Sequence, residues 1–374
     1  MNHRYYMNLA LNEAEKGIGL TGSNPSVGCL LLNQQKEIIG LARTANNGRP
    51  HAEAVAIEQA QLQGYSTDFA IAYVTLEPCV HQGASQSCVA SIIDAGIKTV
   101  VVATVDPDLR TNGLGIKTLR DSGVEVIYDR SQTNEKIRAE KIIRGFISRM
   151  SKKRPFISLK IASSLDGKIA LHNGQSKWIT TEKQREYSHS IRERADAILT
   201  GIGTVLADDP MLNCRLPGSD KRPIRIILDG ELKIPEKSMI CKTAFEIRTI
   251  IYTSITSEQD KKELLEKLGI EVVIVPNFIQ QSHASSSNLD LERVLHHSAK
   301  LGINEILLET GSKLTTRFLQ ERLVDQLYWF YSNKIIGNDG LPVCLDLGCD
   351  DLDMYSNIPT EIILDRELYS IKIM

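Results

Sequence analysis

Hydrophobic positions in the N-terminal part of the chain repeat with two different periods. Residues 4–17 carry apolar side chains at helical spacing, which predicts an amphipathic helix. The runs 26–32 and 37–42 lie close together and predict a β-hairpin. A second helix is expected to start near Pro50 and to stop at Gly64. The chain therefore begins as a layered protein in which helices cover a sheet.

Continuous apolar runs indicate buried strands in the rest of this region. Residues 70–76 and 98–104 are such runs, and they enclose a helix that Ser87 is expected to cap and Gly96 to end. A further helix precedes a strand at 124–128. This order predicts an α/β domain with a largely parallel sheet.

The segment 148–155 separates this region from a second one. It is polar, basic and ends in proline, so we place a boundary there and expect domains at 1–148 and 149–374. Residues 280–288 are low in complexity and predict a surface loop. The second half repeats the alternation, with strands expected at 156–162, 196–201, 224–230, 249–254, 271–276, 305–310 and 325–332.

Length and charge narrow the class of partner. The 374 residues fit two domains. A formal charge of -2 and a pI near 6.5 leave no basic excess for a polynucleotide, so a small molecule is expected as the partner, and no nucleic acid. No run of about 18 apolar residues occurs, so no membrane partner is expected. Seven cysteines, an odd number in a large chain, suit a reducing compartment and predict a cytoplasmic protein.

Four residues in the first half have the chemistry of a hydrolytic zinc site. Zinc in such sites takes three Cys or His ligands and leaves a fourth position to water. His51, Cys79 and Cys88 supply one imidazole and two thiols, and Cys88 opens a helix, whose dipole favours a thiolate. Glu53 lies two residues after His51 and would carry protons. Zinc deaminases show this arrangement as H-x-E followed by P-C-x-x-C, although the two cysteines are farther apart here.

Each of these residues also has a simpler interpretation when taken alone. A single cysteine is most often an inert core thiol, and an isolated His-x-Glu carries little information. The combination is far more specific, because a strand leads into Cys79 while helices begin at His51 and Cys88. We therefore predict a Zn²⁺-dependent deaminase.

Motifs along nearly the whole chain carry a family resemblance. They stand at 24–29, 51–53, 76–81, 106–107, 160–168, 176–180, 198–210 and 309–311. In this order they closely resemble the bifunctional riboflavin-biosynthesis deaminase/reductase family. The resemblance implies a cytidine-deaminase-like three-layer α/β/α domain followed by a dihydrofolate-reductase-like α/β domain.

The resemblance also implies two consecutive reactions. A zinc-activated water would attack 2,5-diamino-6-(5-phosphoribosylamino)pyrimidin-4-one and release ammonia, with Asn24 and His81 beside the substrate. NADPH would then reduce the ribosyl group to ribityl. Matching positions imply cofactor contacts at Ala162, Trp178, Thr204, Asp208 and Gly311. Matching positions imply substrate contacts at Ser176, Arg192, Leu212, Arg215 and Glu309.

Some features of the second half leave alternatives open. Gly201 and Gly203 are followed by Leu206 where a dinucleotide fingerprint has glycine, so alone they indicate a turn. A deaminase whose second domain only binds or oligomerises is the alternative function, and a nucleoside or nucleic-acid deaminase is a third. A homo-oligomer is expected, with the strand 325–336 as one segment that could pair across a dimer.

Two loops depart from the family pattern. Residues 84–87 lack the Thr-Pro-Pro run that usually precedes the second cysteine ligand. Residues 108–113 lack the proline and part of the glycine pattern that usually follow Asp106 and Pro107. Substrate binding beside these loops could therefore differ from that of the family.

Overall fold

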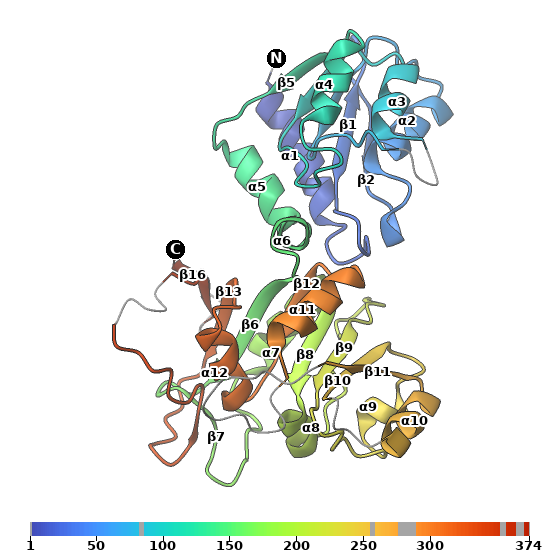
Figure 1. Cartoon of the computed structure of the whole chain (residues 1–374). Coiled ribbons are helices and arrows are strands. Elements are labelled where there is room, and N and C mark those ends of the chain that lie inside the picture. Colours follow the sequence, from blue (N-terminus) through green and yellow to red (C-terminus); the bar gives the residue numbers. More distant parts are fainter. Residues whose placement is uncertain are drawn as a thin grey trace. The chain divides into compact units, whose positions relative to one another are not determined.

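The computed structural model describes residues 2–81, 86–254, 259–275, 289–351, 357–363 and 370–373. The chain divides into two compact units, Met1–Lys153 and Arg154–Met374 (Figure 1). The division falls slightly later than residue 148, because helix α6 (Arg144–Lys152) packs on α5 (Asn134–Ile142) and continues to the end of the first unit. The predicted loop at 280–288 lies outside the described residues.

The first unit is built on a five-stranded sheet with the order β2-β1-β3-β4-β5. The predicted N-terminal helix, hairpin and following strands are confirmed. The other elements of this unit are α1 (His3–Glu15), β1 (Gly28–Leu32), β2 (Ile38–Arg43), η1 (Asn46–Gly48), α2 (Ala52–Leu62), β3 (Ile71–Val74), α3 (Cys88–Asp94), β4 (Thr99–Val102), α4 (Leu114–Asp121) and β5 (Glu125–Tyr128).

This sheet is mixed rather than largely parallel. Strand β1 runs antiparallel to both β2 and β3, whereas β3, β4 and β5 are parallel to one another. The reason is the hairpin: its short turn reverses β2, and the chain then crosses over β1 through α2 to reach β3. Only the later helix-linked strands follow the parallel pattern.

Helices cover both faces of β1, whose five residues are all buried. Helices α1 and α2 both pack on this strand. Two glycines let these helices lie close to the sheet. A Cβ on Gly28 in β1 would lie 1.9 Å from the carbonyl oxygen of Ala10 in α1, and a Cβ on Gly40 in β2 would lie 2.4 Å from the carbonyl oxygen of Ala56 in α2. The resulting α/β/α layers fix the start of α2, where His51 lies.

The second unit contains a nine-stranded sheet with the order β11-β10-β9-β8-β12-β6-β13-β15-β16. All neighbours are parallel except β15 and β16. The elements are β6 (Phe156–Ser163), β7 (Lys168–Ala170), α7 (Glu182–Arg194), β8 (Ala197–Gly201), α8 (Ile202–Asp208), β9 (Ile224–Leu228), α9 (Met239–Lys242), β10 (Thr249–Thr253), α10 (Gln259–Lys267), β11 (Ile270–Ile274), α11 (Leu291–Lys300), β12 (Glu305–Leu308), α12 (Ser312–Gln320), β13 (Gln326–Tyr331), β14 (Leu341–Pro342), β15 (Thr360–Ile363) and β16 (Ser370–Ile373).

All seven strands expected in this half are confirmed, but one expectation about β13 is wrong. Within the segment 325–336, strand β13 offers no free edge to a second copy, because it pairs with β6 on one side and β15 on the other. The continuous apolar run at 327–331 is typical of an interior strand. No helix in the described part of the chain is long and apolar enough to cross a membrane.

Candidate active sites

The start of helix α2 positions His51 and Glu53. His51 is the N-cap residue, with extended backbone angles, and its side chain is not used to cap the helix. The turn before it is held by Asn24, whose Nδ2 donates to the carbonyl oxygen of Gly48 at 2.8 Å. Gly48 has a φ of +90°, and a Cβ there would lie 2.6 Å from Asn24 Nδ2. Asn24 therefore positions the loop that leads to His51, and the substrate contact expected of Asn24 stays a prediction.

Cys79 and Cys88 approach His51 from a loop and a helix end. Cys79 follows β3, and Cys88 is the first residue of α3. Ser87 caps this helix as predicted, because its hydroxyl accepts the backbone N–H of Ala90 at 3.2 Å. The backbone N–H of Cys88 also donates to Cys79 Sγ at 3.5 Å, so the helix end holds both sulfur atoms.

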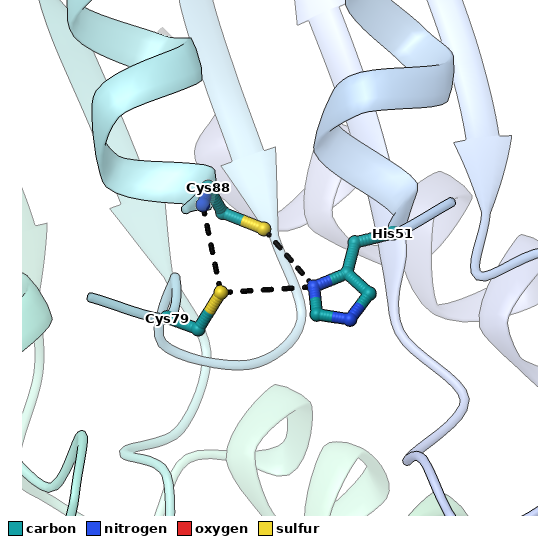
Figure 2. Close-up of side chains that lie close together, drawn as sticks. All are labelled: His51, Cys79 and Cys88. Atoms are coloured by element: carbon teal, nitrogen blue, oxygen red, sulfur yellow. Dashed lines mark hydrogen bonds between the residues drawn. The ribbon is translucent and has the colours of Figure 1, made fainter. Parts of the chain in front are cut away.

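The imidazole and the two thiols converge on one point (Figure 2). His51 Nδ1 lies 3.2 Å from Cys88 Sγ and 3.7 Å from Cys79 Sγ, and all three ligand atoms lie within 4.8 Å of one another. This is the metal-ligand group that the sequence predicted. Among the described residues it is the one group of three or more such side chains close enough to hold a metal ion.

The protonation of this group favours metal binding. A hydrogen bond from Cys88 and the adjacent His51 lower the pKa of Cys79 to about 4, despite its burial. The hydrogen bond to Cys79 and burial raise the pKa of Cys88. These shifts make Cys79 the first of the two thiols to ionise, and a divalent cation would favour ionisation of the second. One nitrogen and two sulfurs are a donor set that fits zinc and leaves a coordination position open.

Glu53 lies beside the ligands in the first turn of α2 and is only 4% exposed. Burial raises its pKa, partly opposed by its backbone hydrogen bond and by His51. A carboxyl with a raised pKa is suited to taking up and releasing a proton near neutral pH. A cavity of about 360 Å³ opens at His51 and Cys88, lined also by Arg49, Pro50, Ala54, Gln86 and Ser91.

Glu77 is a site residue to which the sequence analysis gave no role. Its carboxylate is 2% exposed and accepts three backbone N–H bonds, from Asp106 at 3.2 Å, Gly113 at 2.9 Å and Ile116 at 3.0 Å. It thereby ties the start of α4 to the loop that carries Cys79. A charged residue directly after a buried strand and before the ligand motif was the signal that could have indicated it.

Of the two loops that depart from the family pattern, the structure describes 84–87 in part and 108–113 in full. Residues 84 and 85 lie outside the described residues, while Gln86 Nε2 donates to Asp94 at 2.6 Å. The segment 108–113 folds back on the site, where Thr111 Oγ1 lies 3.4 Å from His81 Nδ1. The substrate contact expected of His81 stays a prediction.

The expected reductase residues gather at the carboxyl ends of neighbouring parallel strands. Ala162 lies near the end of β6, Thr204 and Asp208 lie in α8 directly after β8, and Gly311 precedes α12 after β12. Strand β12 pairs with both β6 and β8, so these ends are adjacent. Ligands of open parallel sheets bind at this edge.

Two glycines at this edge lie where the protein itself has room for a side chain. Nothing lies within 4 Å of a Cβ built on Gly203 or Gly311, and neither has a positive φ. Gly311 is the N-cap of α12 and has no side-chain cap, so the first N–H groups of this helix are available. Open space and free donors at a helix start fit a phosphate-bearing cofactor.

Arg192 and Glu309 form the centre of a buried charge cluster. Arg192 Nε and Nη2 donate to the two carboxylate oxygens of Glu309 at 2.5 and 2.7 Å. Burial alone would raise the pKa of Glu309, but Arg192 and Lys160 outweigh it and lower the pKa to about 2. Arg215 lies near enough to Arg192 to be affected by its charge. Three cations thus face one carboxylate, which favours an anionic ligand.

Three other residues were expected to contact the substrate or the cofactor: Leu212, Trp178 and Ser176. The side chain of Leu212 is 3% exposed and packs in the core, so only its backbone can face a substrate. Trp178 is 62% exposed, with the Arg185 guanidinium 4.2 Å from its ring centre. Ser176 makes no side-chain hydrogen bond within the described part of the chain. Their predicted contacts stay predictions.

Comparisons with known proteins cover both units. Residues 1–104 match the cytidine and deoxycytidylate deaminase zinc-binding region, and residues 155–360 match the RibD C-terminal domain. The riboflavin biosynthesis protein RibD of Aquifex aeolicus is 38% identical over 93% of this chain and 91% of its own.

Two solved structures are similar over nearly the whole chain. The deaminase/5-amino-6-(5-phosphoribosylamino)uracil reductase of Thermotoga maritima is 35% identical with a TM-score of 0.78, covering 94% of this chain and 93% of its own. RibD of Acinetobacter baumannii is 30% identical with a TM-score of 0.82, covering 100% and 99%.

Fold, metal-ligand group and matched regions define a zinc-binding deaminase joined in one chain to a reductase. The first unit supplies the metal-ligand group and the second the parallel sheet with its charged edge. The chain belongs to the RibD family, the bifunctional deaminases and reductases of riboflavin biosynthesis.

Proposed function

We propose that the chain hydrolytically deaminates 2,5-diamino-6-(5-phosphoribosylamino)pyrimidin-4-one and then reduces the ribosyl group of the product to ribityl with NADPH. We assign the deamination to residues 1–148 and the reduction to residues 149–374. The observation that carries the proposal is the convergence of His51, Cys79 and Cys88 beside the buried Glu53, on a chain whose second half matches a reductase.

In the deaminase site, His51, Cys79 and Cys88 would hold zinc. Zinc in such a site lowers the pKa of water toward about 7. Glu53 would take a proton from that water and pass it to the departing amino group, because its raised pKa allows both steps. Glu77 would keep the Cys79 loop and the segment 106–116 in one arrangement.

Asn24 and His81 would border the pyrimidine. Asn24 already holds the turn before His51 through its Nδ2, which leaves its amide oxygen for a ligand. His81 stands next to Thr111, so a substrate there would touch both the Cys79 loop and the segment that Glu77 ties down. This would make binding sensitive to the atypical sequence at 108–113.

In the reductase site, NADPH would supply the hydride. Ala162, Trp178, Thr204, Asp208 and Gly311 are the proposed contacts of the cofactor. Open space at Gly203 and Gly311 supports this, because a side chain there would occupy the room that a cofactor phosphate needs.

The charge cluster would bind the phosphorylated substrate. Arg192 is held by Glu309, whereas the Arg215 guanidinium makes no ion pair within the described part of the chain and donates only to Asn213 Oδ1 at 3.3 Å. Arg215 is therefore the cation with the most capacity for a phosphate, to which guanidinium groups bind bidentately. Ser176, Leu212 and Glu309 would complete the substrate contacts.

An anaerobic assay of zinc-analysed protein tests both steps. The phosphoribosylated diaminopyrimidine is added, ammonia is measured, and NADPH oxidation is followed after it. We expect NADPH oxidation that depends on prior ammonia release. Ammonia without NADPH oxidation would instead support a deaminase with a non-catalytic second domain. If zinc-loaded protein gives neither ammonia nor NADPH oxidation, the proposed substrate is refuted.

The cellular compartment and the assembly of subunits are proposed from the amino-acid sequence. We propose a cytoplasmic homo-oligomer in which β13 does not extend its sheet into a second copy, because both edges of this strand are paired. Sedimentation of the purified protein would give its subunit number.

A further inference from the structure

His189 lies in the reductase charge cluster without a role in the proposed function. It is in α7, three residues before Arg192, so both side chains lie on the same side of the helix. Lys160, Arg192, Arg215 and Glu309 are the charged groups close enough to affect its ionisation. A histidine among three cations is an unusual choice unless it remains neutral.

The hydrogen bonding of His189 fixes which of its nitrogens carries the proton. The backbone N–H of Arg215 donates to His189 Nδ1 at 3.2 Å. A backbone N–H can only donate, so Nδ1 must be unprotonated and accept. The imidazole is therefore neutral, with its proton on Nε2.

The same helix holds the neighbouring residues of this segment. Arg192 Nη1 donates to the carbonyl oxygen of Asn213 at 2.8 Å, and Cys214 Sγ donates to the carbonyl oxygen of His189 at 3.5 Å. Residues 213–215 are thus attached to α7 at three successive positions. Of these attachments, the one at Arg215 depends on the His189 side chain alone.

We infer that His189 is a positioning residue of the reductase, which as the neutral Nε2–H tautomer holds the Arg215 backbone and so aims its guanidinium at the anionic group of the substrate. The inference rests on the proposed binding of a phosphorylated substrate at Arg215. His189 acts through Arg215 and touches neither the cofactor nor the reacting carbon.

Two substitutions separate the hydrogen bond from the volume of the ring. His189→Leu fills similar space and accepts no hydrogen bond, whereas His189→Asn places an amide oxygen near the position of Nδ1. We expect His189→Leu to raise the reductase KM for the deaminated substrate about tenfold, equivalent to about 1.4 kcal/mol, with kcat much less affected. His189→Asn should restore most of the loss.

The bifunctional chain provides internal controls. Ammonia release belongs to the other unit and should not change, and the Kd of NADPH should stay the same in both variants. Trp178 and Trp329 are the two tryptophans of the chain, and both lie in the second unit, so their fluorescence checks that this unit is folded. An unchanged KM in His189→Leu, or equal losses in both variants, would overturn the inference.

A measurement on the free protein keeps this test separate from the proposed function. If wild-type protein does not oxidise NADPH with this substrate, the proposed function fails, but the tautomer can still be examined. In ¹⁵N-histidine-labelled protein at neutral pH, the resonances lost in His189→Asn should be those of a neutral Nε2–H imidazole. A proton on Nδ1, or an imidazolium, would refute the positioning role directly.

Discussion

The two active sites of this chain are encoded in different ways. The deaminase site uses three ligands whose chemistry is specific to metals, placed at the starts of two helices and after one strand. The reductase site uses common residue types from β6, α7, β8 and β12, whose members are adjacent only because parallel strands end at one edge. The first site is recognisable from its side chains, and the second from its place in the fold.

The sites also differ in how their charges are balanced. In the deaminase site, two thiols and one imidazole share protons among themselves and are suited to a cation. In the reductase site, Lys160, Arg192 and Arg215 exceed the single carboxylate of Glu309 and are suited to an anion. Substitutions should therefore affect each site through a different ligand, which makes the following predictions separable.

Removing a metal ligand should have the largest effect. His51→Ala leaves two thiols and should lower ammonia release by more than about 100-fold, since loss of even an outer partner of a metal ligand costs about 10–100-fold. Zinc content, measured by atomic absorption, should fall with it. Reduction of separately supplied deaminated substrate should be unchanged.

The matched control for that variant is His172→Ala, whose side chain is 69% exposed. It should retain both zinc and ammonia release. Full ammonia release by His51→Ala would disprove the zinc assignment.

Neutralising Glu309 should have the next largest effect and should be confined to the second unit. Glu309→Gln leaves Arg192 and Lys160 without a counter-charge, and breaking a buried ion pair costs about 3–5 kcal/mol. Urea unfolding followed by tryptophan fluorescence reports this unit alone. NADPH oxidation should be lost, while ammonia release should continue.

The exposed ion pair of Arg248 and Glu271 is the control, because Glu→Gln removes the same charge there without burial. Both side chains are nearly half exposed, so Glu271→Gln should cost at most about 1 kcal/mol. Equal urea midpoints for the two variants would show that the Arg192–Glu309 pair does not stabilise the unit.

The difference between the two sites also explains which site residues the sequence could predict. His51, Glu53, Cys79 and Cys88 could be found from residue type and local pattern, since each stands at an element boundary that the sequence also predicts. Glu77 was not found, because its partners are backbone N–H groups more than 25 residues away, and any residue type can supply those.

The fold was predictable to a similar degree. Strands of the second unit were found because parallel strands buried on both faces are continuous apolar runs. The pairing across a dimer suggested for 325–336 was wrong for β13, since pairing partners depend on strand order, which a local pattern does not contain. The position of His189 beside Arg215 was also not predictable, because the two residues are distant along the chain.

Replacing Glu77 should have an intermediate effect on the first unit. Glu77→Gln removes one carboxylate oxygen and places an amide NH₂ against backbone N–H groups, at about 1–3 kcal/mol for the unsatisfied donors. Hydrogen exchange at Gly113 and Ile116 should become faster, and ammonia release should fall while zinc is retained.

Glu58, which is exposed on α2, provides the comparison. Glu58→Gln should change neither exchange nor activity. Unchanged protection of Gly113 and Ile116 in Glu77→Gln would mean that the segment 106–116 holds its arrangement without the carboxylate.

Acidification should give the smallest effect and should distinguish His189 from the other groups. Burial, Arg192 and Arg215 lower the pKa of His189 to about 4, from an ordinary value of 6.5. Between these values the unfolded chain binds a proton that the folded unit does not, so stability falls as pH decreases from 6.5 toward 4. His189→Asn does not titrate, and the tryptophan-monitored urea midpoint of its second unit should therefore depend less on pH in this window. His297 also has a lowered pKa, but it is present in both proteins, so the difference between them isolates His189. Equal pH dependence in the two proteins would mean that His189 binds protons alike in the folded and unfolded chains, which a neutral acceptor held by the Arg215 backbone cannot do.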